Sequence, residues 1–319
     1  MAQAQPVGEE ARAEYLRRIE QKCYADMEYM YRNVDKRLDP RLLMPGVKTI
    51  VSVALSYVPA RRIPDDQYQI AAYAYGKDYH EVMKAKLHQL AARLRRYADF
   101  NYRAFCDTAP VMERYWAQQA GIGWRGHNDQ FIVAGHGSMC FLGELFLDIE
   151  LDPSFRNAVH SPLLREGGDR GGSELRTGGE STRCGNCHKC IDACPTGAIT
   201  RENIGTNHPH FNASRCLSYL TIERREALPD DVKSHLGTSI YGCDRCLNAC
   251  PHNQRQPPCT TAELQPSEAL LGMTRAQWQQ LTPDDYRQLF RHSAMKRAKY
   301  EGLRRNIEAV AGNERFPNP

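Results

Sequence analysis

The stretch "CGNCHKCIDACPTGAIT", residues 184–200, places four cysteines at the spacing C-x₂-C-x₂-C-x₃-C, followed by a proline. This spacing is typical of proteins that hold cubane iron–sulfur clusters through cysteine thiolates. A second run, "CDRCLNACP" at residues 243–251, ends in the same way but lacks the third cysteine of the pattern. The two runs predict a ferredoxin-like module over residues 184–255, with one ligand to be found elsewhere.

The missing ligand follows from how such runs share their cysteines. In two-cluster ferredoxins the fourth cysteine of each run binds the cluster of the other run. That rule leaves the second cluster one thiolate short, and Cys216 is the only cysteine between the two runs. The predicted ligands are Cys184, Cys187, Cys190 and Cys250 for the first 4Fe–4S cluster, and Cys194, Cys216, Cys243 and Cys246 for the second.

A pair of zinc sites is the alternative, because closely spaced cysteine pairs also suit tetrahedral zinc. Zinc modules seldom combine the CxxCxxC triplet with a Cys-Pro ending, and that ending occurs here twice. Disulfides are not expected, because eight of the twelve cysteines fall between residues 184 and 250 and the first residues lack the apolar segment of a signal peptide. The clusters by themselves indicate only electron transfer.

The region before the cysteines alternates between helix and strand patterns. Apolar, β-branched residues 49–58 predict a buried strand, and residues 79–98 repeat apolar side chains at helical spacing. Further strands are predicted at 101–107, 129–135 and 137–151, and a helix at 109–121. The expected class is α+β or α/β, with an N-terminal α/β layer domain over residues 1–165.

The remaining segments are a linker and a helical tail. Three Gly-Gly pairs between residues 156 and 183 predict a flexible stretch, whose core we place at 166–183. The segment 256–319 is predicted to be helical, and residues 286–306 carry seven Lys or Arg against one Glu. Such a segment is either a solvated face or a surface for an anionic partner such as RNA, and the residues leave both open.

Asp107, considered alone, is most simply a capping or solvated carboxylate before a helix.

Several motifs occur together with the double cysteine run. They are "VDKRLDPRLLMPGVKTIVSVALSY", "AYAYGKDYH", "CDTAPVMERYWAQQAGIGWRGHN", "GSMCFLGELFLD" and "KRAKYEGLRRNIEAVAGN". In this order they resemble one family, the epoxyqueuosine reductases, and the resemblance covers about residues 30–315.

The resemblance implies an enzyme that reduces the epoxide of epoxyqueuosine, at the wobble position of tRNA, to an alkene. The removal of the epoxide oxygen takes two electrons and a proton, and the family uses cobalamin, bound base-off without a histidine ligand, beside two 4Fe–4S clusters. Asp107 then matches the family's proton donor. The positions that match cobalamin contacts are Arg37, Phe131 and Leu142, and those that match contacts beside the clusters are Ser218 and Asp244.

The expected partners follow from the same resemblance. They are the anticodon stem-loop of tRNA and a low-potential electron donor such as flavodoxin or ferredoxin. The best tRNA-binding candidates are Lys296, Arg297, Lys299 and Arg305. No run of about 18 apolar residues predicts a membrane span, and a cytoplasmic monomer is expected.

The chain departs from the family pattern at three points. His127 stands where lysine is common, the glycine-rich loop is long, and no helical-repeat extension follows the tail. A reductive dehalogenase that acts on a small molecule is the alternative function, because it shares the plan of cobalamin with two clusters. Those enzymes typically carry a twin-arginine export signal, which this sequence does not match.

Overall fold

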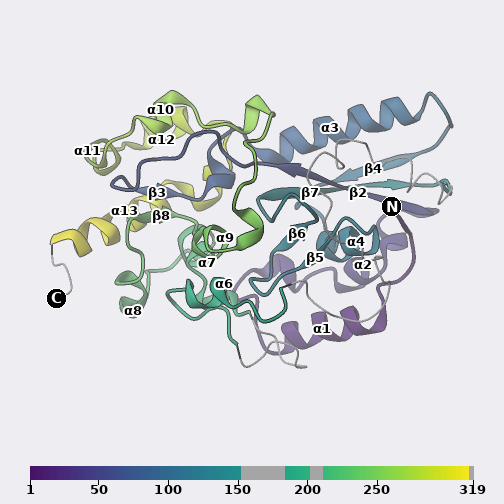
Figure 1. Ribbon diagram of the computed structural model, residues 1–319, viewed down its shortest axis with the longest axis horizontal. Helices are drawn as coiled ribbons and strands as arrows, with labels where there is room; N and C mark the ends of the chain where they lie inside the picture. Colours follow the sequence, from purple (N-terminus) through teal and green to yellow (C-terminus); the bar gives the residue numbers. More distant parts are fainter. Residues whose placement is uncertain (152–183, 202–210, 316–319) are drawn as a thin grey trace.

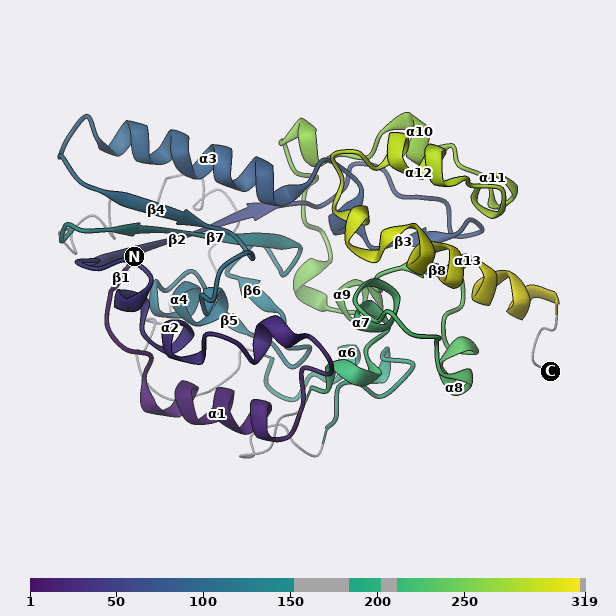
Figure 2. The ribbon, with the colours of Figure 1, turned by 180° about the vertical axis from the view of Figure 1, so that it is seen from behind.

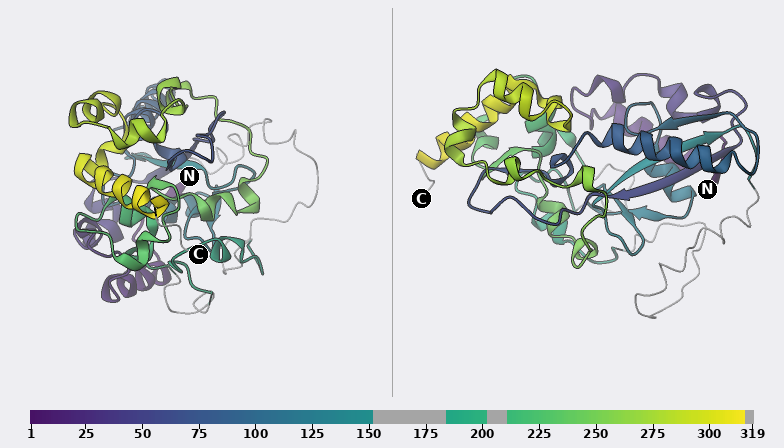
Figure 3. Two further views of the ribbon diagram at one scale, coloured as in Figure 1. Left: turned by 90° about the vertical axis from the view of Figure 1, so that its left-hand side faces the viewer. Right: turned by 90° about the horizontal axis from the view of Figure 1, so that it is seen from above.

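The computed structural model describes residues 1–151, 184–201 and 211–315. Figure 1 shows two halves side by side, an antiparallel sheet with its helices and a mainly helical half that ends in the C-terminus. The view from above in Figure 3 shows the same arrangement. The glycine-rich linker predicted at 166–183 lies outside the described residues.

The main sheet has four strands in the order β1-β2-β7-β4, and every neighbouring pair is antiparallel. An α/β domain would require a parallel sheet, so the α/β expectation is wrong and the α+β alternative describes this half. The predicted strands are present, but β6 pairs with β5 in a separate hairpin instead of joining β7 in the main sheet. The strands are β1 (Ala2–Gln3), β2 (Thr49–Ser56), β4 (Tyr102–Phe105), β5 (Gly123–Arg125), β6 (Phe131–Val133) and β7 (Cys140–Leu147).

Helices cover both faces of this sheet, as Figure 2 shows with α3 on one side and α1, α2 and α4 on the other. Successive residues of a strand point to opposite faces. Leu145 and Leu147 of β7 therefore pack with Met83 of α3, while Phe146 packs with Trp116 of α4. The helices are α1 (Glu9–Glu20), α2 (Val34–Leu38), α3 (Tyr79–Leu94) and α4 (Glu113–Gln119).

The cysteine runs and the C-terminal segment build the helical half. A two-stranded parallel pair, β3 (Gln69–Ile70) with β8 (Ser239–Tyr241), connects it to the N-terminal region. The cysteine-rich helices are α6 (Lys189–Asp192), α7 (Leu217–Ile222), α8 (Asp230–Lys233) and α9 (Arg245–Asn248). The later helices are α10 (Glu268–Leu271), α11 (Arg275–Gln279), α12 (Pro283–Leu289) and α13 (Lys299–Arg315).

The basic stretch 286–306 is interrupted rather than one continuous helix. The helix α12 ends at Leu289, a 3₁₀ turn spans Ala294–Ala298, and α13 begins at Lys299. Leu303 and Ile307 of α13 are fully buried, and the Asn306 amide donates to the carbonyl oxygens of Thr221 and Ile240. Much of this segment is therefore part of the core rather than a solvated tail.

One apolar core runs through both halves. It joins residues of the sheet and α3 to residues of α7, β8 and α13. The predicted boundaries at 165 and 183 lie outside the described residues, and the boundary at 255 stays a prediction. Among the described residues, no helix is both long and apolar enough to cross a bilayer.

Candidate functional site

A large cavity lies between the two halves and contains most of the predicted site residues. Its volume is about 3540 Å³, well above the 300–1,000 Å³ typical of sites for drug-sized ligands. The predicted residues that line it are Arg37, Asp107, Phe131, Leu142, Ser218, Asp244, Cys194, Cys216, Cys243, Cys246, Lys296 and Arg297. The fold thus brings together side chains that are up to 260 positions apart in the sequence.

The cysteines gather into two groups. Cys190 lies within electrostatic range of Cys184, Cys187 and Cys250. Cys216 lies within electrostatic range of Cys194 and Cys243, and Cys246 within range of Cys216 and Cys243 and also of Cys190 from the first group. The eight cysteines thus lie in two neighbouring groups, and the assignment of four ligands to each cluster stays a prediction.

The first cysteine group encloses a small cavity of its own, of about 90 Å³. His127 closes one side of it, and its Nδ1 lies 2.9 Å from the carbonyl oxygen of Cys187. The His127 ring stacks on that of His188 at 5.9 Å. Where the family has lysine, this chain therefore places a buried imidazole against the first cysteine group, a contact that the sequence did not predict.

Arg37 has features expected of a ligand-binding residue. It is buried at the end of α2, where its Nη2 donates to the carbonyl oxygen of Tyr29 at 3.0 Å. Its Nε has no hydrogen-bond partner among the described residues. A buried N–H without a partner is costly, so a ligand in the cavity would satisfy it.

The other predicted cofactor contacts form two walls of the cavity. Phe131 on β6 and Leu142 on β7 pack in one small apolar cluster and give an apolar wall. Ser218 on α7 and Asp244 before α9 lie next to the second cysteine group, and the Asp244 carboxylate accepts a hydrogen bond from the amide of Ala72 at 2.7 Å. An apolar wall with a few placed polar groups suits a large cofactor.

Asp107 follows β4 and presents its carboxylate to the cavity. Its side chain is 62% exposed, and its φ of 53° is in the left-handed region, which is uncommon for aspartate. The helix α4 begins only at Glu113, and its N-cap residue Met112 makes no side-chain capping bond. The capping interpretation of Asp107 is therefore wrong.

Two residues of α3 position the Asp107 carboxylate. The Tyr79 hydroxyl donates a hydrogen bond to Oδ2, and Nε2 of His80 lies 3.8 Å from the same oxygen. The His80 ring is oriented by Asp78, whose Oδ1 is 2.6 Å from Nδ1. The sequence motif "DYH" holds all three residues, but without the fold nothing connected it to Asp107.

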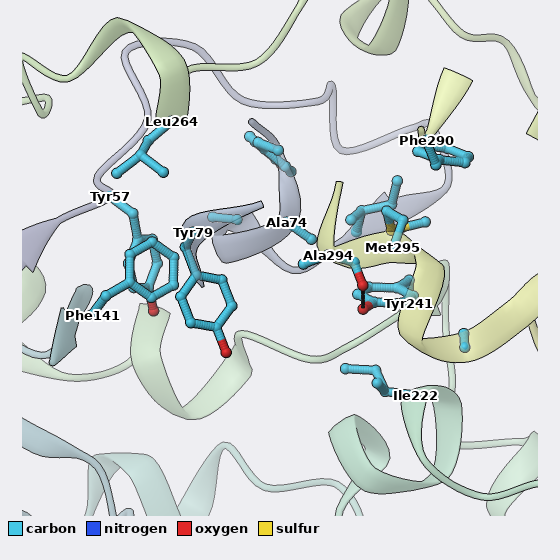
Figure 4. Close-up of a cluster of buried hydrophobic side chains, with 14 of the residues drawn as sticks. Tyr57, Ala74, Tyr79, Phe141, Ile222, Tyr241, Leu264, Phe290, Ala294 and Met295 are labelled. Atoms are coloured by element: carbon cyan, nitrogen blue, oxygen red, sulfur yellow. Dashed lines mark hydrogen bonds between the residues drawn. The ribbon is translucent and has the colours of Figure 1, made fainter. Parts of the chain in front are cut away.

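Stacked rings fix the Tyr79 hydroxyl. Tyr79 lies parallel to Phe141 with ring centres 4.1 Å apart, and Phe141 also contacts Tyr57 at 4.6 Å (Figure 4). Burial, and then the nearby Asp107 carboxylate, raise the pKa of Tyr79 well above its usual value. The hydroxyl therefore keeps its proton and donates it in the hydrogen bond to Asp107.

The four basic residues predicted to bind tRNA have different environments. Lys296 and Arg297 line the cavity, and Lys299 is exposed at the start of α13. Arg297 makes an ion pair with Glu223 at 2.7 Å and lies over the ring of Tyr29. Arg305 donates to the carbonyl oxygens of Leu220 and Arg224, each at 2.9 Å, so it stabilises the end of α7.

Comparisons with known proteins place these features in one family. Residues 37–108 match the family described as epoxyqueuosine reductase QueG, DUF1730, and residues 183–253 match the 4Fe-4S double cluster binding domain. An epoxyqueuosine reductase of Leadbetterella byssophila is 39% identical over 293 residues, which cover 92% of this chain and 86% of the relative. That of Pseudomonas aeruginosa is 32% identical and covers 95% of this chain and 78% of the relative.

Solved structures agree with the sequence matches. The epoxyqueuosine reductase of Streptococcus thermophilus superposes with a TM-score of 0.79 at 25% identity, over 99% of this chain and 77% of that one. An epoxyqueuosine reductase crystallised with an epoxyqueuosine-modified stem loop of tRNA-Tyr gives a TM-score of 0.76 at 25% identity, over 97% of this chain and 75% of that one. The double cluster match favours iron–sulfur clusters over the zinc alternative.

Proposed function

Because the chain belongs to the epoxyqueuosine reductase family, we propose that its large cavity holds cobalamin together with the epoxyqueuosine base of a tRNA. The protein is an oxidoreductase of tRNA modification. The observation that carries the proposal is the single cavity that contains Asp107, Arg37 and the second cysteine group. The size of this cavity supports a large cofactor and a nucleotide together.

Different residues around the cavity would hold cobalamin and the two clusters. Cobalamin, when bound, would supply the strongly reducing chemistry at the epoxide. Arg37 would donate its unpaired Nε to it, Phe131 and Leu142 would pack on it, and Ser218 and Asp244 would contact it beside the clusters. The cysteine ligands proposed are Cys184, Cys187, Cys190 and Cys250 for the first cluster, and Cys194, Cys216, Cys243 and Cys246 for the second.

The order of electron transfer is proposed from which cysteines line the cavity. All four cysteines of the second group line it, whereas those of the first group enclose the separate small cavity. A low-potential donor such as flavodoxin or ferredoxin would therefore reduce the first cluster, and electrons would pass through the second toward cobalamin. The reduction potential of such clusters can be about −400 mV or lower.

A cytoplasmic location and a monomeric state of the protein stay predictions.

Asp107 is proposed as the proton donor to the epoxide oxygen. Its carboxyl group faces the cavity, and Tyr79 and His80 orient it. The substrate base lies in an anticodon loop, so it can be splayed out into the cavity while the protein holds the flanking phosphates. The reductive dehalogenase alternative is not favoured, because the matching families and relatives are epoxyqueuosine reductases.

The test is turnover of a tRNA stem-loop that carries epoxyqueuosine, by protein reconstituted with iron, sulfide and cobalamin. We expect wild-type protein to form queuosine and Asp107→Asn to lose about 10²–10⁴-fold in kcat, the usual contribution of a general acid. Asparagine keeps the size of the side chain and can still accept from Tyr79. Unchanged iron and cobalamin contents are the control. A fully active Asp107→Asn protein would exclude Asp107 as the acid.

A further inference from the structure

Two carboxyl groups lie directly behind Asp107. Glu113 begins α4, and its Oε1 accepts a hydrogen bond from the Asp107 amide at 2.5 Å. Glu144, on β7, is fully buried, and Glu113 is the carboxyl group with which it interacts. Neither oxygen of Glu144 has a hydrogen bond of ordinary geometry within the described residues. A fully buried acid in a central strand is uncommon and calls for a physical reason.

The surroundings of this pair favour the protonated form. Burial, and then the neighbouring Asp107 charge, raise the pKa of Glu113, although Arg114 opposes the shift. Burial and the charge of Glu113 raise the pKa of Glu144. The other titratable groups that face the site are Cys106, Lys84, Tyr79 and His80. Two carboxyl groups this close in a buried site cannot both ionise easily, so the pair keeps a proton near neutral pH.

The reaction needs more protons than Asp107 can supply by itself. Both C–O bonds of the epoxide break and a carbon–carbon double bond forms, which consumes two electrons. The low-potential donor of the proposed function supplies these electrons. One proton converts the departing oxygen to hydroxide, and a second converts hydroxide to water. One carboxyl group delivers one proton, and a base seated over the cavity restricts the access of bulk water to Asp107.

We propose that Glu113 and Glu144 share a stored proton and resupply Asp107 with it while the tRNA covers the cavity. This proposal rests on the proposed function, because it takes Asp107 as the proton donor. Glu113 is the connecting group, since it lies within electrostatic range of Glu144, accepts a hydrogen bond from the Asp107 amide and lines the same cavity as Asp107, so that a water molecule held in the cavity can carry its proton to the Asp107 carboxyl group. Both glutamates act through Asp107 and are therefore positioning residues.

A purely structural role is the competing explanation. By accepting the amide of Asp107, Glu113 also holds this residue in its left-handed conformation. Glutamine separates the two roles, because its Oε1 still accepts from the amide whereas its side chain cannot store a proton. Glu113→Gln therefore removes the proton store and keeps the support.

The experiment measures kcat against pH for wild type, Glu113→Gln, Glu144→Gln and the double variant. At about pH 6, where protons are abundant, we expect each variant to stay within about threefold of wild type. At about pH 8 we expect each to fall about tenfold or more, so the alkaline limb moves to lower pH. The double variant should lose no more than Glu113→Gln alone, because both residues hold one proton.

Matched controls keep the outcomes distinct. Glu81→Gln removes an exposed carboxyl group on α3 and should leave the profile unchanged. Iron content, cobalamin content and thermal unfolding verify that each variant folds, and if one glutamine variant does not fold the other carries the same expectation. A wild-type profile in Glu113→Gln, or a loss that is equal at every pH, would overturn the proton store. Asp107→Asn fails at every pH if the proposed function holds, so an active Asp107→Asn would instead refute the acid itself.

Discussion

Two buried carboxyl sites on the same side of the sheet differ in their charge. Asp129, in the turn between β5 and β6, accepts hydrogen bonds from Arg18 at 2.9 and 3.0 Å and from Arg114 at 3.2 Å. Burial alone would raise the pKa of Asp129, but Arg18, Arg125 and Arg114 outweigh it and hold that pKa well below its usual range. Glu144 is also buried and Glu113 is half-buried, yet their pKa values are raised.

The difference teaches that burial by itself does not decide whether an acid is charged. Three guanidinium groups from α1, α4 and β5 converge on Asp129, whereas among the main influences on the pKa of Glu113 the Arg114 charge is the only cationic one within the described residues. The Asp129 site therefore serves stability, because it ties α1 to the β5–β6 hairpin. The raised pKa values of the glutamate pair favour the protonated form next to the cavity.

The largest effect is expected from removing the charge of Asp129. Asp129→Asn leaves buried Arg18 without its main counter-charge, and breaking a buried ion pair in this way typically costs about 3–5 kcal/mol in the free energy of unfolding. Denaturant unfolding of the reconstituted protein at neutral pH measures it. Asp284→Asn, in an exposed pair with Arg287, is the control and should cost about 0–1 kcal/mol. A loss as small as that of the control would mean that the Asp129 site is not a buried ionic site.

A smaller effect is expected in how stability depends on pH. The raised pKa values of Glu113 and Glu144 mean that the folded state holds a proton that the unfolded state releases above about pH 4.5. Stability is therefore full below that pH and falls as pH rises toward the folded pKa. Asp129, with its lowered pKa, acts in the opposite direction and loses its contribution only in acid.

Thermal unfolding between about pH 5 and pH 8 tests this contrast. Wild type should lose about 1.4 kcal/mol per pH unit wherever in this range the folded pair holds one proton more than the unfolded chain. Glu144→Gln should flatten the slope, whatever it does to absolute stability by burying an amide. A variant with the wild-type slope would show that the pair ionises freely in the folded protein.

The smallest effect is expected from the replacement of exposed lysines near the cavity. Arg305 already binds backbone carbonyl oxygens, whereas Lys296 and Lys299 are exposed at or near the cavity. Lys296→Gln with Lys299→Gln should weaken tRNA binding and lower the slope of log affinity against log salt by about 0.7–0.9 per phosphate contact. Arg287→Gln, which removes an exposed cation that pairs with Asp284, should leave both unchanged. An unaltered slope in the double lysine variant would move the tRNA surface elsewhere.

The sequence predicted the iron–sulfur chemistry from the spacing of its cysteines. The two Cys-Pro runs and Cys216 defined eight ligand candidates, and the fold brings them into two neighbouring groups. The strands at 49–56 and 140–147 were also predictable, because each is a mainly apolar run. Strand direction was not, since an apolar run does not specify whether its neighbour is parallel or antiparallel.

The sequence by itself determined the family and predicted the cluster ligands and the candidate acid, because these depend on local spacing and on motifs that occur in order along the chain. Only the tertiary structure decided the surroundings of the charged residues. Asp129 lies among guanidinium groups, Glu144 is buried with a raised pKa and Arg305 binds backbone carbonyl oxygens because of groups that lie far away in sequence, such as Arg18 for Asp129 and the Leu220 carbonyl oxygen for Arg305. The protonation and the partners of a buried group depend on the surrounding charges in space, which no local pattern records.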